Sequence, residues 1–212
     1  LDSSSVGKKI EEQSILVTGK DGSVGLLFSN GTLVTVKPGT RFYLREYSQK
    51  IFKPSGFPSP SKLEEEPSQS RLLAHLDFGE LVVKVPKLRK GSNMILSSPL
   101  GTAGIRGTMF QLMAVRNPVT GDITGGVNLI SGDVTFTDLN GNVQSMVSGQ
   151  SVQVASSQLG LARAVKMGAL VDLNSIYRSS LIDGNVPPTV DQLFPDVSPD
   201  SESDDSSPDP FS

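Results

Sequence analysis

Cysteine and tryptophan are absent from this chain of 212 residues, and histidine occurs once. The absence of cysteine excludes disulfides, thiol nucleophiles and thiolate metal sites. A zinc site needs several His, Cys or carboxylate ligands, so a single histidine also argues against zinc. Aromatic residues make up only 6% of the sequence, which gives little support to a sugar-binding surface. The sequence predicts no cofactor.

Long hydrophobic runs are also missing. No stretch of about 20 apolar residues occurs, so no membrane-spanning helix is predicted. No signal peptide is visible at Leu1, although an exported protein could have lost one there. A membrane tether outside this chain is therefore left open.

Charge is distributed unevenly along the chain. The net charge is −3, but residues 195–212 hold six acidic residues and no lysine or arginine. Setting these six aside leaves 16 of the 22 acidic residues against 19 basic ones, so the body is mildly basic. Nucleic-acid binding needs a clustered basic face, and no such partner is predicted. The segment 195–212, rich in serine and proline, is predicted to be a disordered acidic tail.

Between residues 15 and 155 apolar and polar residues alternate, and glycine-containing turns divide them. An Asn30-Gly31 pair, typical of a tight hairpin, precedes an alternating run at residues 33–37. Further along, short apolar strands are separated by Gly132, Gly141 and Gly149. This pattern predicts an all-β domain over residues 15–155, a solenoid-like stack of short strands and hairpins.

Three other segments flank or interrupt this domain. Residues 1–14 form a polar lead-in. Residues 53–70 are rich in proline and serine and include Glu64-Glu65-Glu66, which prefers water. They are predicted to be an exposed insertion, either a floppy loop or a partner-binding loop. In 156–194, apolar residues recur at helical spacing, which predicts a helical extension with a short helix at residues 170–182.

The most informative segment is residues 98–110, in which Gly101, Gly104 and Gly107 stand ahead of a strand-like run. Glycine tolerates positive φ and close backbone approach, so the spacing predicts a crowded turn before a buried strand. It is not a phosphate loop, because the Gly-Lys-Ser/Thr ending is missing and no helix follows. Arg106 either holds turn carbonyls or a carboxylate in the core, or contacts a partner from the surface.

This segment resembles the hallmark of the FecR family, Gly-x-x-Gly-Thr-x-Phe, at residues 104–110. Further pieces similar to that family follow the same order along roughly residues 15–155; they are Gly25–Phe42, Phe78–Val85, Leu129–Val134 and Val147–Gln150. The motif residues to which the resemblance gives a structural role are Gly101, Gly104, Arg106, Gly107, Thr108 and Phe110.

The resemblance implies a bacterial, extracytoplasmic all-β domain of stacked short strands. The best-known members of the family lie in the periplasm and relay a signal from an outer-membrane transporter to a cytoplasmic sigma factor. By this resemblance, we expect a periplasmic or cell-surface protein whose partner is another protein of the cell envelope.

Few residues offer catalytic chemistry. His75 and Asp77 lie on the same face of a strand, as a Ser-His-Asp site would need, but a lone histidine beside apolar residues is more often structural. Because nothing assembles acid, base and nucleophile, no catalytic residue and no small-molecule substrate are predicted. The function expected is non-enzymatic protein contact, for which an exposed strand edge and broad faces are suited.

Two alternatives stay open. One is a surface or wall-associated scaffold that binds glycan or self-assembles, for which Tyr43, Tyr47 and Phe52 could form an aromatic platform. The other is a solenoid hydrolase with an unrecognised carboxylate pair. Its candidates are Glu80 and Asp133, which each follow a glycine and would have to be adjacent in a groove.

Overall fold

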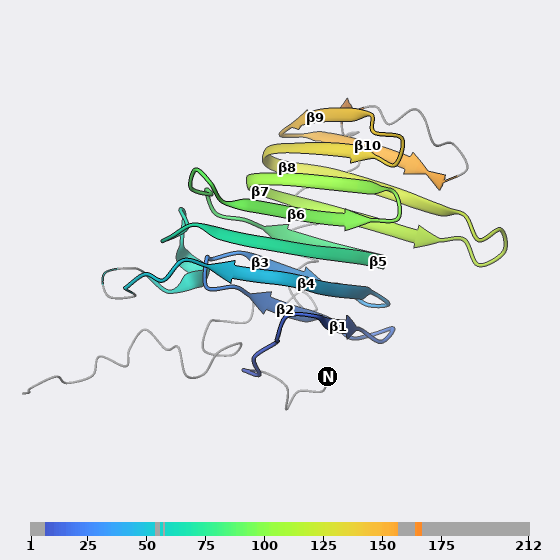
Figure 1. Ribbon diagram of the computed structural model, residues 1–212. Helices are drawn as coiled ribbons and strands as arrows, with labels where there is room; N and C mark the ends of the chain where they lie inside the picture. Colours follow the sequence, from blue (N-terminus) through green and yellow to red (C-terminus); the bar gives the residue numbers. More distant parts are fainter. Residues whose placement is uncertain (1–6, 54–55, 57, 157–163, 167–212) are drawn as a thin grey trace, which may run out of the picture.

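The computed structural model of the protein describes residues 7–53, 56, 58–156 and 164–166. These residues form one open sheet of 11 strands, together with a short 3-10 helix η2 (Pro60–Lys62) and no helix long and apolar enough to span a membrane (Figure 1). The all-β prediction is confirmed. The strands are β1 (Ser14–Val17), β2 (Val24–Leu27), β3 (Leu33–Val36), β4 (Arg41–Gln49), β5 (Ser70–Lys84), β6 (Asn93–Ser98), β7 (Gly101–Arg116), β8 (Ile123–Asp138), β9 (Val143–Val147), β10 (Gln150–Ala155) and β11 (Ala164–Lys166).

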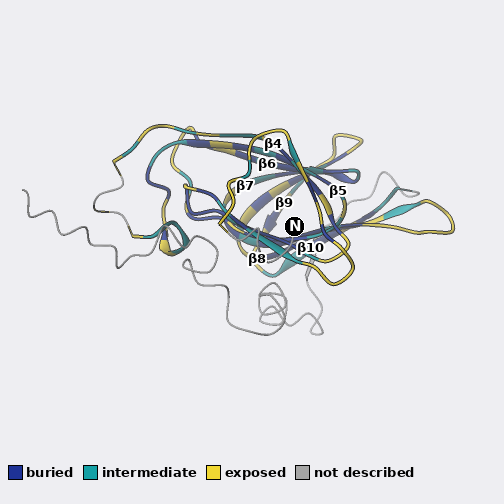
Figure 2. Cartoon of the chain, turned by 90° about the horizontal axis from the view of Figure 1, so that it is seen from below, coloured by how far each residue is buried: buried dark blue, intermediate teal, exposed yellow. Residues whose placement is uncertain are grey.

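Three long strands, β5, β7 and β8, pass from one half of the sheet to the other. The first part of β5 pairs with β4 and β6, whereas its last residues pair with β3 and β7. In the same way β7 pairs with β6 through residues 101–105 and with β5 through residues 109–114. The strands therefore lie in two layers, with β4 and β6 in one and β10 in the other (Figure 2).

The expectation of short strands is wrong for these three elements, which have 15 or 16 residues each. Glycines with positive φ explain the difference: Gly79, Gly107 and Gly132 lie inside β5, β7 and β8. Glycine adopts this conformation without a steric cost, so the strand can bend and continue into the other layer. Local alternation alone does not show where such a bend replaces a turn.

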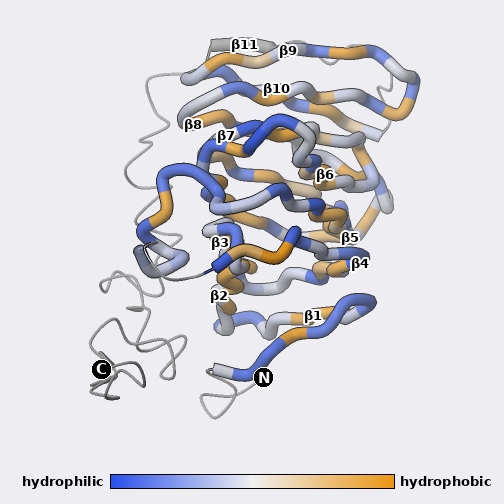
Figure 3. Tube along the Cα trace, turned by 60° about the vertical axis from the view of Figure 1, so that its left-hand side comes forward, coloured by the Kyte–Doolittle hydropathy of each residue, from blue (hydrophilic) through white to orange (hydrophobic). Residues whose placement is uncertain are grey.

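The two ends of the sheet are open. β1 and β2 lie at one end of the stack of strands and β9, β10 and β11 at the other (Figure 3). Among the described strands β1 pairs with β4 alone, and β9 pairs with β8 alone. Edge strands of this kind leave backbone N–H and C=O groups available for pairing.

The core lies between the two layers. Its large side chains with no more than 1% exposure include Phe42, Phe110, Phe136, Leu81 and Leu129, which come from β4, β5, β7 and β8. Alternate residues of β7 contribute to this core from one face of the strand. The long strands are thus held by the apolar area that they bury.

The insertion predicted at residues 53–70 is only partly exposed. Leu63 is 7% exposed and Glu66 is fully buried, so the expectation that all three glutamates prefer water is wrong for Glu66. Its carboxylate accepts hydrogen bonds from the hydroxyls of Ser70 (2.5 Å) and Ser92 and from the Arg89 N–H (2.6 Å). These charge-assisted bonds compensate for the loss of water around the carboxylate.

The predicted helical extension, 156–194, is described only in part. Residues 164–166 within it form β11, a strand that pairs with β10 and lies ahead of the predicted helix. The helix predicted at 170–182 and the acidic tail at 195–212 lie outside the described residues.

Candidate functional site

The bend in β5 at Gly79 lies beside a groove in the surface of the sheet. Gly79 has a φ of +103°, and a Cβ at this position would overlap Thr40, the residue before β4. Only glycine fits both this conformation and this close approach. On one side of the bend Phe78 pairs with Arg41 of β4; at the bend itself Gly79 pairs with Ala114 of β7.

Glu80 follows the bend, and both of its backbone polar groups are hydrogen-bonded. Its N–H donates to Thr40 Oγ1 at 3.0 Å. Its carbonyl accepts from the Lys37 N–H at 3.0 Å and from the Thr40 hydroxyl at 3.3 Å. The backbone of Glu80 is thereby fixed against the turn that joins β3 to β4.

A row of amide side chains positions the Glu80 carboxylate. Gln111 Nε2 donates to Glu80 Oε1 at 2.8 Å, and Asn128 Nδ2 donates to Gln111 Oε1 at 2.6 Å. Gln153 Nε2 continues the row at 3.4 Å from Asn128 Oδ1. We call Gln111, Asn128 and Gln153 the amide row; it lies on the face that points away from the core. Each amide donates toward Glu80, and the row ends on a carboxylate, which can only accept.

Two members of the amide row are shielded from water. Gln111 is 9% exposed and Asn128 is 7% exposed. Hydrogen bonds in such surroundings compete little with water, so they hold the side chains in one orientation. The carboxylate oxygen of Glu80 is therefore placed by contacts that extend across β7, β8 and β10.

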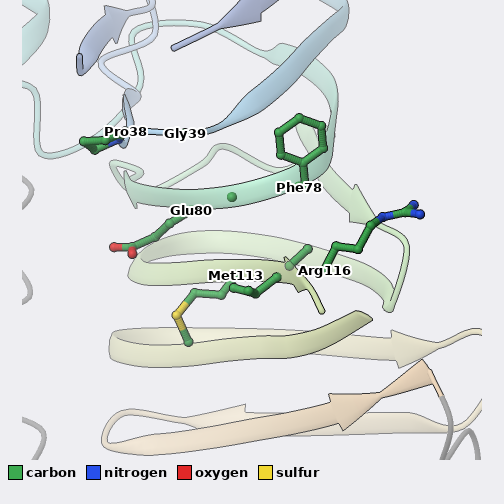
Figure 4. A pocket seen from close by; sticks show the side chains of 9 residues that line it. Pro38, Gly39, Phe78, Glu80, Met113 and Arg116 are labelled. Carbon is green, nitrogen blue, oxygen red and sulfur yellow. The ribbon is translucent and has the colours of Figure 1, made fainter. Parts of the chain in front are cut away.

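A groove of about 580 Å³ opens beside the bend, and we call it the β5 groove. This volume is in the range of small-molecule sites. In Figure 4, Glu80 lies toward the Pro38–Gly39 turn, and Phe78 and Arg116 lie toward the other end of the groove. The side chains that the argument uses are Phe78, Glu80, Met113, Val115 and Arg116.

Two apolar side chains of the β5 groove are exposed. Phe78 is 40% exposed and Val115 is 56% exposed. The ladder between β5 and β7 ends at Ala114, so Val115 and Arg116 pair with β8 alone among the described strands. The groove thus combines apolar surface, an open strand side and one charge of each sign.

A second cluster surrounds His75 on the opposite layer. His75 Nδ1 lies 2.8 Å from Ser97 Oγ, and His75 Nε2 lies 3.2 Å from Asp77 Oδ1. Arg41 Nε pairs with the other oxygen of Asp77 at 2.9 Å. When the ring is neutral and Nε2–H donates to Asp77, Nδ1 is left to accept from the Ser97 hydroxyl.

Burial lowers the pKa of His75 below its ordinary value, while Asp77 acts in the opposite direction and Arg45 adds to the lowering. The ring is therefore neutral at neutral pH. Ser97 lies inside β6, aligned with His75 on one side and Thr102 on the other. An oxyanion site needs N–H groups free to point at a substrate, and the ladders on both sides of Ser97 use the strand N–H groups. The cluster therefore fits a structural hydrogen-bond chain better than a nucleophile.

The two carboxylates of the hydrolase alternative lie on different strands, Glu80 on β5 and Asp133 on β8, and both strands pair with β7. Glu80 is aligned with Met113 of β7, whereas Asp133 is aligned with Arg106. These two β7 positions lie on opposite sides of the bulge after Arg106. The condition of adjacency in one groove is not met, since the lining of the β5 groove includes Glu80 and not Asp133.

The motif residues lie in β7, and the crowded turn expected at 101–107 is instead part of this strand. Gly101 is strand backbone with φ +153°, and a Cβ there would overlap the Thr137 carbonyl. Gly104 lies in ordinary strand surroundings. Gly107 has φ +64°, and a Cβ there would lie 3.1 Å from Lys87 Cα. From Gly101 to Ile105 the backbone is held as a strand because β6 and β8 pair with it on both sides, and the bend comes at Gly107, where the ladder with β8 shifts register.

The remaining motif residues separate into core and surface. Thr108 is 3% exposed and Phe110 is fully buried. Arg106 is exposed and lies across from Asp133, so of its two alternatives the structure has the surface position and not the core position. Strand alternation explains this, since Ile105 points inward and its neighbour must point outward.

The aromatic platform of the glycan alternative is not formed. Tyr47 packs against Phe28, with ring centroids 4.9 Å apart, and lies against the core. Tyr43 lies instead beside Arg45, whose guanidinium is 5.6 Å from the ring centroid, and donates to Gln13. A register shift in β4 between Leu44 and Glu46 turns the two tyrosines to different sides.

The amide row was missed from the sequence. Its only signal is a polar residue at the centre of strands that are otherwise apolar, Gln111 in β7 and Asn128 in β8. That the two residues are directly opposite each other depends on the register between the strands, which the sequence does not show.

Two solved structures share this fold. One is a candidate anti-sigma factor from Parabacteroides distasonis ATCC 8503 at 1.65 Å resolution, with a TM-score of 0.53 and 15% identity over 74% of this chain and 61% of that one. The other, of the same description at 2.50 Å, has a TM-score of 0.54 and 13% identity over 77% of this chain and 64% of that one. This chain therefore spans less than two thirds of either.

No curated protein sequence matches the chain. The profile of the FecR protein family matches residues 14–135, which is more than half of the sequence. The matched region contains β1 to β7 and most of β8, with the bend at Gly79 and the whole motif around Phe110. On this match, the chain belongs to the FecR family.

Proposed function

We propose that this protein is a non-enzymatic interaction domain that works outside the bacterial cytoplasm, in the periplasm or at the cell surface. Its partner is another protein of the cell envelope, in a signalling role of the FecR type. The proposal is supported by membership of the FecR family and by the fold shared with candidate anti-sigma factors. The strands act as a solenoid-like stack whose open ends receive the partner.

The observation that carries this proposal is the exposed apolar edge at each end of the sheet. Ile15 and Val17 on β1 are 52% and 62% exposed. Val143 and Val147 on β9 are 64% and 56% exposed. Soluble proteins usually protect sheet edges with charge or proline, so unprotected β-branched edges favour pairing with another chain.

Affinity capture from an envelope extract tests the proposal with edge variants. Lysine at an edge position blocks strand addition, so Ile15→Lys with Val17→Lys, or Val143→Lys with Val147→Lys, should abolish capture of the partner. Val119→Lys is the matched control, because Val119 is 90% exposed but lies in the β7–β8 connection. If both edge variants still capture the partner, recognition through the edges is refuted.

Self-assembly is a second candidate, and the presence of an open edge at both ends favours it. β9 of one copy could pair with β1 of the next, which would extend the sheet from molecule to molecule. Sedimentation velocity across a range of concentrations tests this. An increase in sedimentation coefficient with protein concentration would support the scaffold role if either pair of lysine substitutions removes it. A monomer at all concentrations would exclude that role.

A further inference from the structure

The β5 groove differs from the two open edges in position and chemistry. It lies at the bend between the two layers, and its floor includes exposed apolar surface from Phe78 and Val115. Phe78 and Val115 line the same groove, and an apolar patch with polar residues at its rim is typical of a surface that contacts a ligand or partner. The carboxylate of Glu80 lies at one end of this surface (Figure 4).

The Glu80 carboxylate is held in one position and keeps one oxygen available for a ligand. Oε1 accepts from Gln111, and no described residue is hydrogen-bonded or ion-paired to Oε2. The backbone of the same residue is held by Thr40 and Lys37. A carboxylate fixed at both its backbone and one oxygen needs little ordering when it binds a cation.

The shape of the groove favours an extended chain. Val115 and Arg116 continue β7 beyond its last pair with β5, so the β5 side of the strand is open there. An extended segment can pair with such a strand and place alternate side chains in the groove. Arg116 lies at the end of the groove away from Glu80, where it would repel a second basic group and could donate hydrogen bonds to a carbonyl or an acidic group.

We infer that the β5 groove receives an extended segment of a partner protein that places a lysine or arginine side chain on the Glu80 carboxylate. Apolar side chains of that segment pack on Phe78, Met113 and Val115. The inference rests on the proposed protein-interaction function and names a second contact surface for it. The amide row serves this contact by holding Glu80 Oε1 and leaving Oε2 for the basic group.

Fluorescence anisotropy with labelled peptides tests the inference. The probes are Val-Thr-Lys-Thr-Val, Val-Thr-Arg-Thr-Val and the same peptide with Gln or Glu at the centre, so that the valines share the face of the central residue. The lysine and arginine peptides should bind about tenfold more tightly than the glutamine peptide, because a charge-assisted bond replaces a neutral one. The glutamate peptide should bind least.

Three variants separate the groove from non-specific attraction. Glu80→Gln should remove the preference for a basic centre, and Gln111→Leu should weaken it by releasing the carboxylate. Glu64→Gln is the matched control, because Glu64 is exposed and distant in the chain from the groove residues. Phe78→Ser, at a side chain that is already 40% exposed, should weaken all four peptides together.

An equal affinity for the lysine and glutamine peptides, or a preference that survives Glu80→Gln, would overturn the inference. If Glu80→Gln lowered the melting temperature, Phe78→Ser would still decide whether the peptides use the groove. In one outcome, capture from the envelope extract depends on the β1 or β9 edge, but no basic peptide binds more tightly than the glutamine peptide. That outcome would refute the inference about the groove and retain the proposed function. Loss of the edge dependence alone would refute the proposed function as stated.

Discussion

Gly79 lies so close to Thr40 that a Cβ at position 79 would overlap the threonine side chain. The same hydroxyl accepts from the Glu80 N–H at 3.0 Å. Thr40 therefore fixes the bend of β5 and also positions the backbone of Glu80 in the groove. The fold and the candidate site are coupled at this point, and changes at Gly79 should affect both.

Gly79→Ala should destabilise the protein by about 3 kcal/mol, since the backbone has a positive φ and the new methyl group has no space. Gly141→Ala is the control: Gly141 also has a positive φ (+82°), but nothing lies within 4 Å of its Cβ position. That change should cost about 1–2 kcal/mol, the conformational part alone. Urea denaturation of both variants measures the difference, and equal losses would show that Thr40 moves aside at no cost.

Phe110→Ala should cost about 3–5 kcal/mol, because the ring is fully buried and its loss leaves a cavity. Phe78→Ala, at a ring that is 40% exposed, should cost less than about 1 kcal/mol. The two changes remove the same side chain, so thermal or urea unfolding compares burial directly. A small loss at Phe110 would mean that the motif phenylalanine does not anchor the core.

Much of the sheet could be predicted from the sequence because its signals are local. The Asn30-Gly31 pair does lie between β2 and β3, and the run from Thr108 does form part of a strand with Phe110, Leu112 and Ala114 in the core. A turn does precede the strand, at Pro99 and Leu100, but the strand begins at Gly101 and not at Thr108, because glycine spacing does not distinguish a turn from a bent strand. Only pairing with β6 and β8 on both sides decides between them.

Glu66→Gln should destabilise the protein by about 1–3 kcal/mol. The carboxylate accepts from Ser70, Ser92 and the Arg89 N–H, and glutamine supplies one acceptor oxygen where the network uses two. Glu64→Gln, two residues away and exposed, should change stability by no more than about 0.5 kcal/mol. Chemical denaturation of the pair is the measurement, and an equal effect would show that the charge of Glu66 is not needed.

The candidate site could be predicted only as separate residues. Glu80 and His75 stood out in the sequence as possible reactive groups, but their partners are distant in the chain: Gln111 for Glu80 and Ser97 for His75. Both pairs form because β5 has β6 and β7 as neighbours, with a different neighbour on each side of its bend. Without the register between these strands, the sequence does not show that Gln111 contacts Glu80.

The stability of the protein should fall as the pH drops below the ordinary histidine value of about 6.5, and part of this fall should come from His75. Burial, chiefly, holds the pKa of His75 below that value in the folded state, although Asp77 opposes the shift and Arg45 adds to it. The unfolded chain then binds a proton at a pH where the folded chain does not, so stability increases with pH between the two pKa values.

His75→Gln removes this titration and keeps a polar side chain beside Ser97. Urea unfolding at about pH 7.5 and about pH 5 should therefore show a smaller fall in the variant than in the wild type. A larger fall in the variant would mean that the pair with Asp77 dominates and holds the ring protonated, which would reverse the sign of the effect.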